Sequence, residues 1–398
     1  MNKVSSQKAH FCFVMPFHIR EGRGGGAEVQ AWLLARELAR RGNTVSYVAQ
    51  SVRGKAGKEE ILDEVRLRWV RYAHHFRWSN APAYYRAMAE LDPDIVVQRM
   101  TNFMTGVVGL YCRRHGKKFV WMCTDNAAPL RWMSWRAQRR TNRSRKVNPV
   151  KAAVFLADAF VSDLARQWGM RQVSLAFTQN EFQEEALRRS FGLASRRMIS
   201  GHEAPARVIS PEERLAGGIV LWVANLGPNK RPEKFFQLAR MGHGSGLRFV
   251  IIGGRQDAVY IENLFKDAPP NLEWLGRRPF TETLAWFDRA AFFVNTSFAE
   301  GFPNTFIQAW LRGVPVLTLS ADPDGIIARE GLGRVCPDTE AMLGDLLDLA
   351  TRPEEYDRLS RRVMDFASDR YTVSAVADAF LENVDRLCAC EEGQGHRS

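Results

Sequence analysis

Two polar residues near position 300 are spaced so that one ligand could contact both. Glu300 and Gln308 lie in the segment EGFPNTFIQ, where Gly, Pro and Asn indicate a tight turn and a helix follows from Thr305. Gln308 then lies in the first turn of that helix, near the carboxylate of Glu300. A carboxylate accepts hydroxyl protons, an amide both donates and accepts, and the free N–H groups of a helix start favour anions. The segment therefore predicts a site for an anionic or polyhydroxylated ligand, although turns of this kind also occur without one.

A second polar turn places two cations where a helix is expected to begin. Lys230 and Arg231 follow an apolar run at 219–224, within the sequence NLGPNKRPE that starts at Asn225. The N-terminus of a helix favours anions over cations, so this arrangement is typical of a turn that binds a diphosphate. A solvated Lys-Arg pair would have the same composition. We interpret the turn as a phosphate site and include Asn225 among its binding residues.

A loop rich in glycine follows the first apolar run of the chain. The sequence GRGGGAE at 22–28 contains Gly24, Gly25 and Gly26, and three consecutive glycines allow the backbone to approach a phosphate or a sugar closely. The loop resembles half of a dinucleotide fingerprint, but nicotinamide binding also requires an acidic residue at the end of the next strand. Residues 47–50, YVAQ, offer none. We therefore expect phosphate or sugar contacts here and no nicotinamide.

These loops lie between short apolar runs that alternate with amphipathic segments, as in parallel sheets covered by helices on both faces. We expect strands at 10–16, 45–48, 65–70, 95–98, 119–123, 173–178, 219–224, 248–252, 272–274, 291–295 and 314–319. We expect helices at 27–41, 84–91, 103–115, 179–191, 354–367 and 372–387, followed by a frayed tail.

The length of 398 residues indicates two domains of ordinary size. Residues 205–216 contain two Pro, several charges and no apolar period, which indicates a linker. The sequence predicts an N-terminal domain at 1–205, a second domain at 217–371 and a C-terminal helix at 372–390. The fold class is α/β, with two Rossmann-like, doubly wound domains that face each other across a cleft. The glycine loop and the turn that carries Glu300 would then lie on opposite sides of that cleft.

The net charge of +12 is concentrated in the first half of the chain. Residues 1–210 contain 35 Lys and Arg against 17 Asp and Glu, and residues 211–398 contain 21 against 27. The densest stretch, Arg131 to Lys151, has eight basic residues, two Trp and no acidic residue. Cations interleaved with Trp favour an anionic membrane surface. A solvated basic loop is the alternative. No nucleic-acid-binding motif accompanies the charge, so we expect no nucleic acid partner.

The rest of the composition narrows the class of protein. No window approaches ~18 uninterrupted apolar residues, and the start, MNKVSSQKAH, lacks the apolar core of a signal peptide. We therefore expect a cytoplasmic protein, which the basic stretch would place peripherally on the inner face of the membrane. The six Cys form no CxxC pair and have no His at ligand spacing, so we expect neither a disulfide framework nor a zinc site.

Together, four motifs resemble those of the GT-B retaining glycosyltransferases of family four, also described as glycosyl transferases group 1. They are GGGAE at 24–28, NLGPNKRPE at 225–233, LGR at 275–277 and EGFPNTFIQAWLRGVPV at 300–316, and their order and spacing match over about residues 10–388. The resemblance implies a nucleoside-diphosphate sugar bound mainly to the second domain, an acceptor on the first, and a last helix that crosses back to the first. The implied reaction moves the sugar to a hydroxyl acceptor. The basic, Trp-containing segment suggests that this acceptor is a lipid-linked or membrane-proximal glycan, as in surface polysaccharide or glycoconjugate synthesis.

The resemblance also implies a role for the residues of each motif. Lys230 would hold the diphosphate and Glu300 the donor sugar, and we assign the catalytic roles to these two residues. Gln308 would bind the ribose. The other substrate-binding residues that we expect are Gly24, Gly25, Gly26, Asn225, Arg231, Gly276, Arg277, Gly301, Phe302, Asn304 and Thr305. Members of the family usually need no metal, so we expect no metal and no cofactor besides the donor co-substrate.

Three positions depart from the pattern of the family. Gln308 stands where a second Glu is typical, and Asn225 stands where an Arg is common. Residues 124–126, TDN, offer no counterpart to a His that often lies near the donor sugar. These changes predict weaker binding of the phosphates. They keep two alternatives open, namely a GT-B protein that binds a ligand or partner without catalysis and a sugar-nucleotide epimerase.

Overall fold

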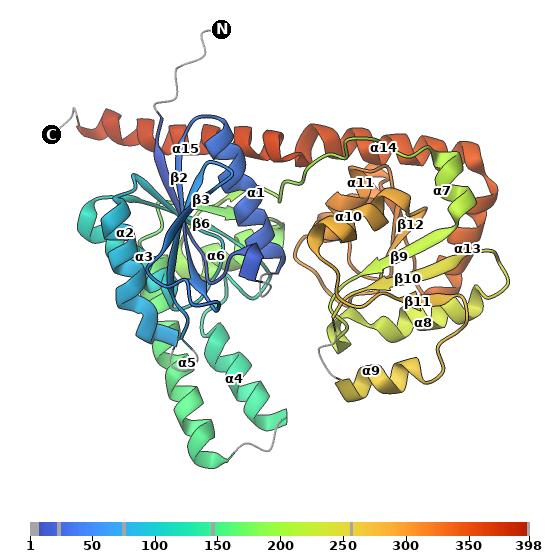
Figure 1. Ribbon diagram of the computed structural model, residues 1–398, viewed down its shortest axis with the longest axis horizontal. Coiled ribbons are helices and arrows are strands. Elements are labelled where there is room, and N and C mark those ends of the chain that lie inside the picture. The colour runs from blue at the N-terminus through green and yellow to red at the C-terminus, as the bar shows by residue number, and fades with distance from the viewer. Residues whose placement is uncertain (1–7, 22–24, 74–76, 145–147, 255–257, 396–398) are drawn as a thin grey trace, which may run out of the picture. The chain divides into compact units, whose positions relative to one another are not determined.

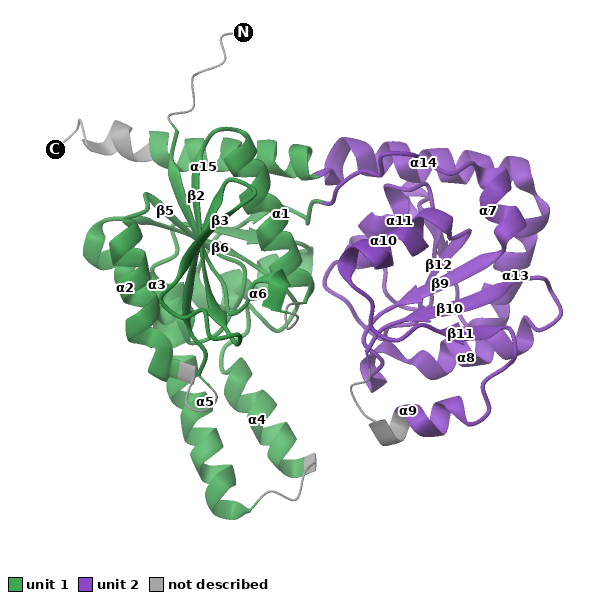
Figure 2. Ribbon diagram, in the orientation of Figure 1, with its two compact units in different colours: residues 1–201, 373–398 green, residues 202–372 purple. Residues whose placement is uncertain are grey.

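The computed structural model forms two compact units (Figures 1 and 2) and describes residues 8–21, 25–73, 77–144, 148–254 and 258–395. Unit 1 comprises residues 1–201 and 373–398, and unit 2 comprises residues 202–372. The last helix, α15 (Val373–Gly395), belongs to unit 1 although it follows unit 2 in the sequence. It continues to Gly395, so the tail that was expected to fray after residue 387 is helical over these residues.

Unit 1 contains an eight-stranded sheet in the order β3-β4-β2-β1-β5-β6-β7-β8. The strands are β1 (His10–Val14), β2 (Thr44–Ser51), β3 (Glu59–Leu62), β4 (Val65–Arg71), β5 (Ile95–Gln98), β6 (Lys118–Met122), β7 (Leu175–Thr178) and β8 (Arg196–Arg197). All neighbours pair in parallel except β3 and β4. The chain builds outward from β1 through β2 and then crosses to β5 on the other side of β1. The topological switch point of this sheet therefore lies between β1 and β5.

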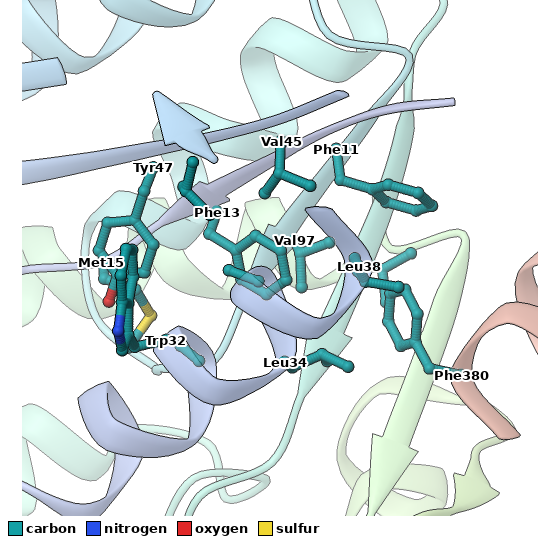
Figure 3. Packing of buried hydrophobic residues seen from close by; sticks show 14 of the residues in the cluster. Phe11, Phe13, Met15, Trp32, Leu34, Leu38, Val45, Tyr47, Val97 and Phe380 are labelled. Carbon is teal, nitrogen blue, oxygen red and sulfur yellow. The ribbon is translucent and has the colours of Figure 1, made fainter. Parts of the chain in front are cut away.

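Helices cover both faces of this sheet. They are α1 (Gly26–Arg40), α2 (Ala81–Leu91), α3 (Met104–His115), α6 (Glu181–Phe191) and α15. On one face, apolar side chains from β1, β2 and α1 pack with Phe380 of α15 (Figure 3). The ring of Phe380 lies 5.8 Å from that of Phe11 on β1. The last helix is thus part of the core of unit 1, because its apolar side chains belong to the cluster that covers this face of the sheet.

The basic stretch of unit 1 forms a helical hairpin, and no helix was expected there. Its helices, α4 (Met133–Ser144) and α5 (Pro149–Met170), extend away from the sheet (Figure 1). The carboxylate of Asp163 on α5 accepts the backbone N–H of Trp135 at the start of α4 (3.0 Å), and the buried Arg166 donates to the carbonyl of Leu130 (2.7 Å). The cap of α4 therefore comes from a residue 28 positions away, so it has no local signature in the sequence.

Unit 2 contains a six-stranded, all-parallel sheet in the order β11-β10-β9-β12-β13-β14. The strands are β9 (Ile219–Val223), β10 (Arg248–Ile252), β11 (Leu272–Trp274), β12 (Phe292–Asn295), β13 (Val316–Thr318) and β14 (Gly333–Val335). From β9 the chain builds outward through β10 and β11, and then returns to β12 on the other side of β9. The switch point of this sheet lies between β9 and β12, where open α/β sheets bind their ligands.

The helices of unit 2 include one in the segment that was expected to be a linker. They are α7 (Pro211–Gly217), α8 (Pro232–Met241), α9 (Ala258–Phe265), α10 (Phe280–Arg289), α11 (Asn304–Trp310), α12 (Ile326–Glu330), α13 (Thr339–Thr351) and α14 (Pro353–Tyr371). The linker prediction for 205–216 is therefore wrong over α7. Ser210 caps this helix by accepting the N–H of Glu213 (3.2 Å), Pro211 starts it and the left-handed Gly218 (φ 57°) ends it.

Candidate functional site

The two strands at the switch point of unit 2 lead directly into the two polar turns of the sequence. β9 ends at Val223 and is followed by the turn that contains Lys230, and β12 ends at Asn295 and is followed by the turn that contains Glu300. Because these strands are parallel neighbours, their carboxyl ends lie at the same edge of the sheet. The fold therefore brings together two residues that are 70 positions apart.

Lys230 and Glu300 form an ion pair between Nζ and Oε1. The side chain of Lys230 is 27% exposed and that of Glu300 is 17% exposed. Partial burial keeps the pair from being fully screened by water, and partial exposure leaves both groups accessible to a ligand. A ligand with an anionic end and hydroxyl groups a few ångströms away could take the ammonium and the carboxylate at once.

Thr296 fixes the two turns against each other. Its hydroxyl donates to the carbonyl oxygen of Lys230 (2.7 Å) and accepts the indole N–H of Trp222 on β9 (3.0 Å). A backbone hydrogen bond from Phe298 to the carbonyl of Asn229 (3.0 Å) adds a second link. Thr296 is fully buried, so each of these bonds replaces one that water would otherwise make. Thr296 and Trp222 were not predicted, because their contacts depend on the pairing of strands that are distant in the sequence.

Arg231, which was expected to bind the phosphates, lies against the same turn. Its Nε donates to the carbonyl of Thr296 (2.6 Å), and a terminal nitrogen donates to the hydroxyl of Ser320 (2.9 Å). Its backbone is left-handed (φ 48°) at the start of α8, a conformation that costs energy for a residue with a Cβ. These contacts give Arg231 a positioning role in the structure. Direct binding of phosphate by Arg231 stays a prediction.

The helix after Glu300 starts one residue earlier than predicted. α11 begins at Asn304, so Gln308 is its fifth residue and lies in the second turn rather than the first. Gln308 is only 6% exposed. Its carbonyl accepts a hydrogen bond from Arg312 (3.2 Å), which also pairs with Asp288 (2.6 Å) and so holds the end of α11. Gln308 is thus a buried residue of α11, and binding of the ribose by its amide stays a prediction.

The segment between Glu300 and α11 combines one buried ring with partly buried polar groups. Phe302 is 7% exposed, and its ring packs edge-on against those of Trp310 and Tyr371. Gly301, Asn304 and Thr305 are partly buried. The side-chain oxygen of Asn304 is buried and has no hydrogen-bond partner within the described part of the chain. This segment presents backbone and small polar groups beside Glu300, and its binding roles stay predictions.

The remaining predicted residues of unit 2 lie around the carboxyl ends of β9, β10 and β11. A Cβ built on Gly254 would lie 3.6 Å from the amide oxygen of Asn225 and 3.9 Å from the Cβ of Arg277. Gly276 has a left-handed backbone (φ 71°), and its carbonyl accepts the N–H of Gly253 (3.0 Å). Asn225 and Arg277 are both exposed. The structure therefore places these three predicted residues together.

The predicted glycines of unit 1 lie at the start of α1. The N–H of Gly25 donates to the carboxylate of Glu28 (2.8 Å), and Gly26 is the first residue of the helix. Gly24 lies outside the described residues. Among the residues that the structure does describe, no three His, Cys, Asp or Glu side chains gather in a group that could hold a metal ion.

The chain matches two family profiles. Residues 24–198 match Glycosyltransferase Family 4, and residues 217–352 match Glycosyl transferases group 1. No curated relative matches the chain.

Several solved structures share this fold. Anabaena Alr3699/HepE in complex with UDP and glucose is 13% identical with a TM-score of 0.68, over 95% of this chain and 100% of that chain. Sucrose-phosphate synthase from Thermosynechococcus elongatus is 14% identical with a TM-score of 0.72, over 96% and 100%. The catalytic domain of starch synthase IV from Arabidopsis thaliana, bound to ADP and acarbose, is 13% identical with a TM-score of 0.66, over 96% and 100%. These similarities confirm the predicted α/β fold with two parallel-sheet domains.

Proposed function

Because this chain belongs to the GT-B glycosyltransferases of family 4, we propose that it moves a sugar from a nucleoside-diphosphate sugar to a hydroxyl acceptor with retention of the anomeric configuration. The observation that carries the proposal is the contact between Lys230 and Glu300 at the switch point of unit 2. A sugar and a diphosphate are joined by a single ester bond, so one donor molecule can contact both residues. Similar structures that bind UDP, UDP-glucose or ADP support a nucleoside diphosphate as the leaving group.

In this proposal the two residues act on opposite ends of the bond that breaks. Lys230 offsets the charge that develops on the leaving diphosphate, and Glu300 orients the sugar by accepting its hydroxyl protons. The bond between C1 and the phosphate oxygen breaks, and the acceptor oxygen bonds to C1 on the same face. The proton of the acceptor hydroxyl passes to the leaving phosphate oxygen. No side chain serves as a nucleophile on this route, and the charge on Lys230 makes a metal ion unnecessary.

The surface of the helical hairpin supports the proposal that the acceptor is linked to a membrane. The exposed arginines of α4 are Arg136, Arg139, Arg140 and Arg143. The large apolar residues that α5 exposes are Val150, Val154, Phe155, Phe160, Val161 and Leu164. An anionic lipid surface has the complementary charge and accepts apolar side chains at the level of its headgroups. No described helix is long and apolar enough to cross a membrane. We propose that the hairpin lies on the inner face of the membrane, close to a lipid-linked glycan acceptor of surface polysaccharide synthesis.

The proposed reaction is tested by donor turnover. The purified protein is incubated with UDP-, ADP-, GDP- and TDP-sugars, and the released nucleoside diphosphate is measured with and without EDTA. We expect release from at least one donor, no effect of EDTA, and loss of release in Lys230→Ala and Glu300→Ala. Lys234→Ala is the matched control, because Lys234 bonds to Gln237 on the same helix, α8. Release that persists in Lys230→Ala would overturn the assignment of the diphosphate site.

The same assay separates the two alternatives. A sugar-nucleotide epimerase would convert the donor into a second sugar nucleotide without releasing a nucleoside diphosphate. A binding protein without catalysis would bind a sugar nucleotide and release nothing, whatever the acceptor. The anomeric configuration of the product, measured by proton NMR, tests retention directly.

A further inference from the structure

Arg99 is a buried cation without an anionic partner. It follows β5 directly and is 4% exposed. One terminal nitrogen donates to the hydroxyl of Ser200 (2.7 Å), and Nε has no hydrogen-bond partner. Within the described part of the chain, no carboxylate pairs with the guanidinium. Arg166, another buried arginine of unit 1, does have such a partner in Asp163 (3.3 Å).

The charge on Arg99 persists despite this environment. Burial lowers the pKa of Arg99 to about 10, so the guanidinium remains protonated at neutral pH. A buried charge destabilises a fold unless an opposite charge or a full set of hydrogen bonds offsets it. Hydrogen bonding to Ser200 alone leaves most of the five N–H donors of an arginine unused. A residue of this kind is costly as a structural element and well suited to receive an anion.

The position of Arg99 in the sheet is that of a ligand-binding residue. β5 and β1 flank the topological switch point of unit 1, and open α/β sheets bind ligands at the carboxyl ends of such strands. Nearby polar side chains at the ends of β5 and β7 are also buried and incompletely bonded. They are the amide of Gln98, the hydroxyl of Thr101 and the amide oxygen of Gln179. The amide nitrogen of Gln179 donates to the hydroxyl of Ser200 (3.4 Å). Unsatisfied buried groups of this kind indicate water or a ligand.

A small cavity reaches the guanidinium. It offers about 10 Å³ of room to a water molecule and is lined by Gln30, Leu34, Arg99, Gly201, Val373 and Val376. This is close to the minimum that one water requires. A single phosphoryl or carboxylate oxygen is about as large as that water. One oxygen of an oxyanion can therefore take the place of the water while the rest of the group remains outside.

We propose that Arg99 binds an oxyanion, a phosphoryl or carboxylate group, on the ligand of unit 1. In the proposed reaction, on which this assignment rests, that ligand is the acceptor, which would therefore be a negatively charged glycan or glycolipid. The guanidinium, held at one end by Ser200, has N–H donors left for the one oxygen that the cavity admits.

The test measures phosphate binding in a background without the donor site. Melting temperatures of Lys230→Met and of Lys230→Met/Arg99→Met are compared in inorganic phosphate and in chloride at equal ionic strength. We expect phosphate to stabilise the single variant and to have no effect on the double variant. In chloride the double variant should melt at the same temperature or higher, because it loses an unpaired buried charge. Arg99→Lys, which keeps the charge without the fork, should retain part of the phosphate effect.

Three results would overturn the proposal. They are a phosphate effect that survives Arg99→Met, the absence of any phosphate effect in Lys230→Met, and unfolding or a lower melting temperature of Arg99→Met in chloride, which would make Arg99 a structural residue. None of these readouts depends on donor turnover, so failure of the proposed reaction is seen separately. Binding to phosphatidylglycerol vesicles identifies the source of the oxyanion when the hairpin does not contribute, that is, with Arg136, Arg140 and Arg143 replaced by Ser. Loss of the residual binding on adding Arg99→Met indicates a lipid headgroup, and its retention indicates a soluble or glycan phosphate.

Discussion

Lys230 and Glu300 contact each other across the switch point of unit 2, each at the end of a turn that follows a central strand. The pair is held in register by Thr296, whose hydroxyl bonds to the backbone of Lys230. Without a ligand, the ammonium and the carboxylate neutralise each other. A donor must therefore exchange this contact for one with its diphosphate and one with its sugar, and Thr296 sets the geometry of this exchange.

Thr296→Val should reduce turnover without removing any group that touches the donor. The substitution leaves the indole N–H of Trp222 without its acceptor and frees the carbonyl of Lys230, so we expect a loss of about 1–2 kcal/mol of stability. Because the turn of Lys230 loses its anchor, kcat/KM should also fall. Thr283→Val is the control, because Thr283 makes a similar hydrogen bond to Pro279 (3.0 Å) on α10. Equal losses of activity in the two variants would contradict the positioning role of Thr296.

Gln308→Glu should strengthen binding of the donor. A hydrogen bond from a ribose hydroxyl to a carboxylate is stronger than one to an amide. We expect a lower KM for the donor in Gln308→Glu and a higher one in Gln308→Leu. An unchanged KM in both variants would show that this side chain does not bind the donor.

The stability of unit 1 should depend on pH through His18. Burial lowers the pKa of His18 to about 4, and its ring is enclosed by those of Trp32, Tyr47 and Trp69. The ordinary pKa of about 6.5 applies to the unfolded chain, which therefore binds a proton that the folded chain does not. Stability should fall as the pH drops from about 6.5 toward 4, by up to about 1.4 kcal/mol per pH unit.

Urea unfolding at pH 7 and pH 5 measures this dependence. His18→Phe keeps an aromatic ring in the pocket and should show a flatter pH profile than the wild type. The control is His243→Gln, because His243 is exposed in unit 2 and should leave the profile unchanged. A profile of His18→Phe as steep as that of the wild type would show that other groups cause the dependence.

The hairpin should bind anionic vesicles through both its charge and its apolar face. We expect cosedimentation with phosphatidylglycerol vesicles at low salt, weaker binding at high salt, and none with phosphatidylcholine. Combined substitution of Arg136, Arg140 and Arg143 by Ser should remove most of this binding, and Phe155→Ser should weaken it. Arg352→Ser is the control, since this exposed arginine lies in unit 2. Failure of the wild type to bind at low salt would contradict the proposal that the hairpin lies on a membrane.

Local patterns in the sequence predict most of the sheet of each unit. The strands at 95–98, 248–252 and 272–274 have the predicted bounds. The first two are mostly buried apolar runs between turn residues, which is the pattern that a central strand leaves in the sequence. The helix α4 could not be predicted in this way, since Asp163 caps it through a contact that only the fold creates. α5 and α7 are different cases, because each begins with a capping residue and a proline that are visible in the sequence, Asn148 with Pro149 and Ser210 with Pro211. The first signal was missed and the second was interpreted as a linker.

The sequence predicted those residues of the candidate site that lie in recognisable local motifs, and it did not predict the others. Glu300 and Lys230 stand out because each lies in a polar turn after an apolar run, and the structure brings them into contact. Thr296 has no such signal, since its hydroxyl matters only once β9 and β12 are neighbours. Arg231 stands out for its charge, yet its guanidinium bonds to the backbone of the next turn. Charge and spacing indicate which residues gather at the site, and the fold decides which of them remain available to a ligand.

The separate roles of Lys230 in binding the diphosphate and of Glu300 in orienting the sugar are tested most directly with the wild type, Lys230→Met and Glu300→Gln. Nucleoside diphosphate is titrated into each protein, and the donor turnover of each is measured. Lys230→Met should bind the nucleoside diphosphate at least about tenfold more weakly than the wild type, because it loses a charge-assisted bond. Glu300→Gln should bind it at least as tightly as the wild type, because Lys230 is no longer paired, and should lose about 10²-fold or more in turnover. Wild-type binding by Lys230→Met, or wild-type turnover by Glu300→Gln, would contradict the account.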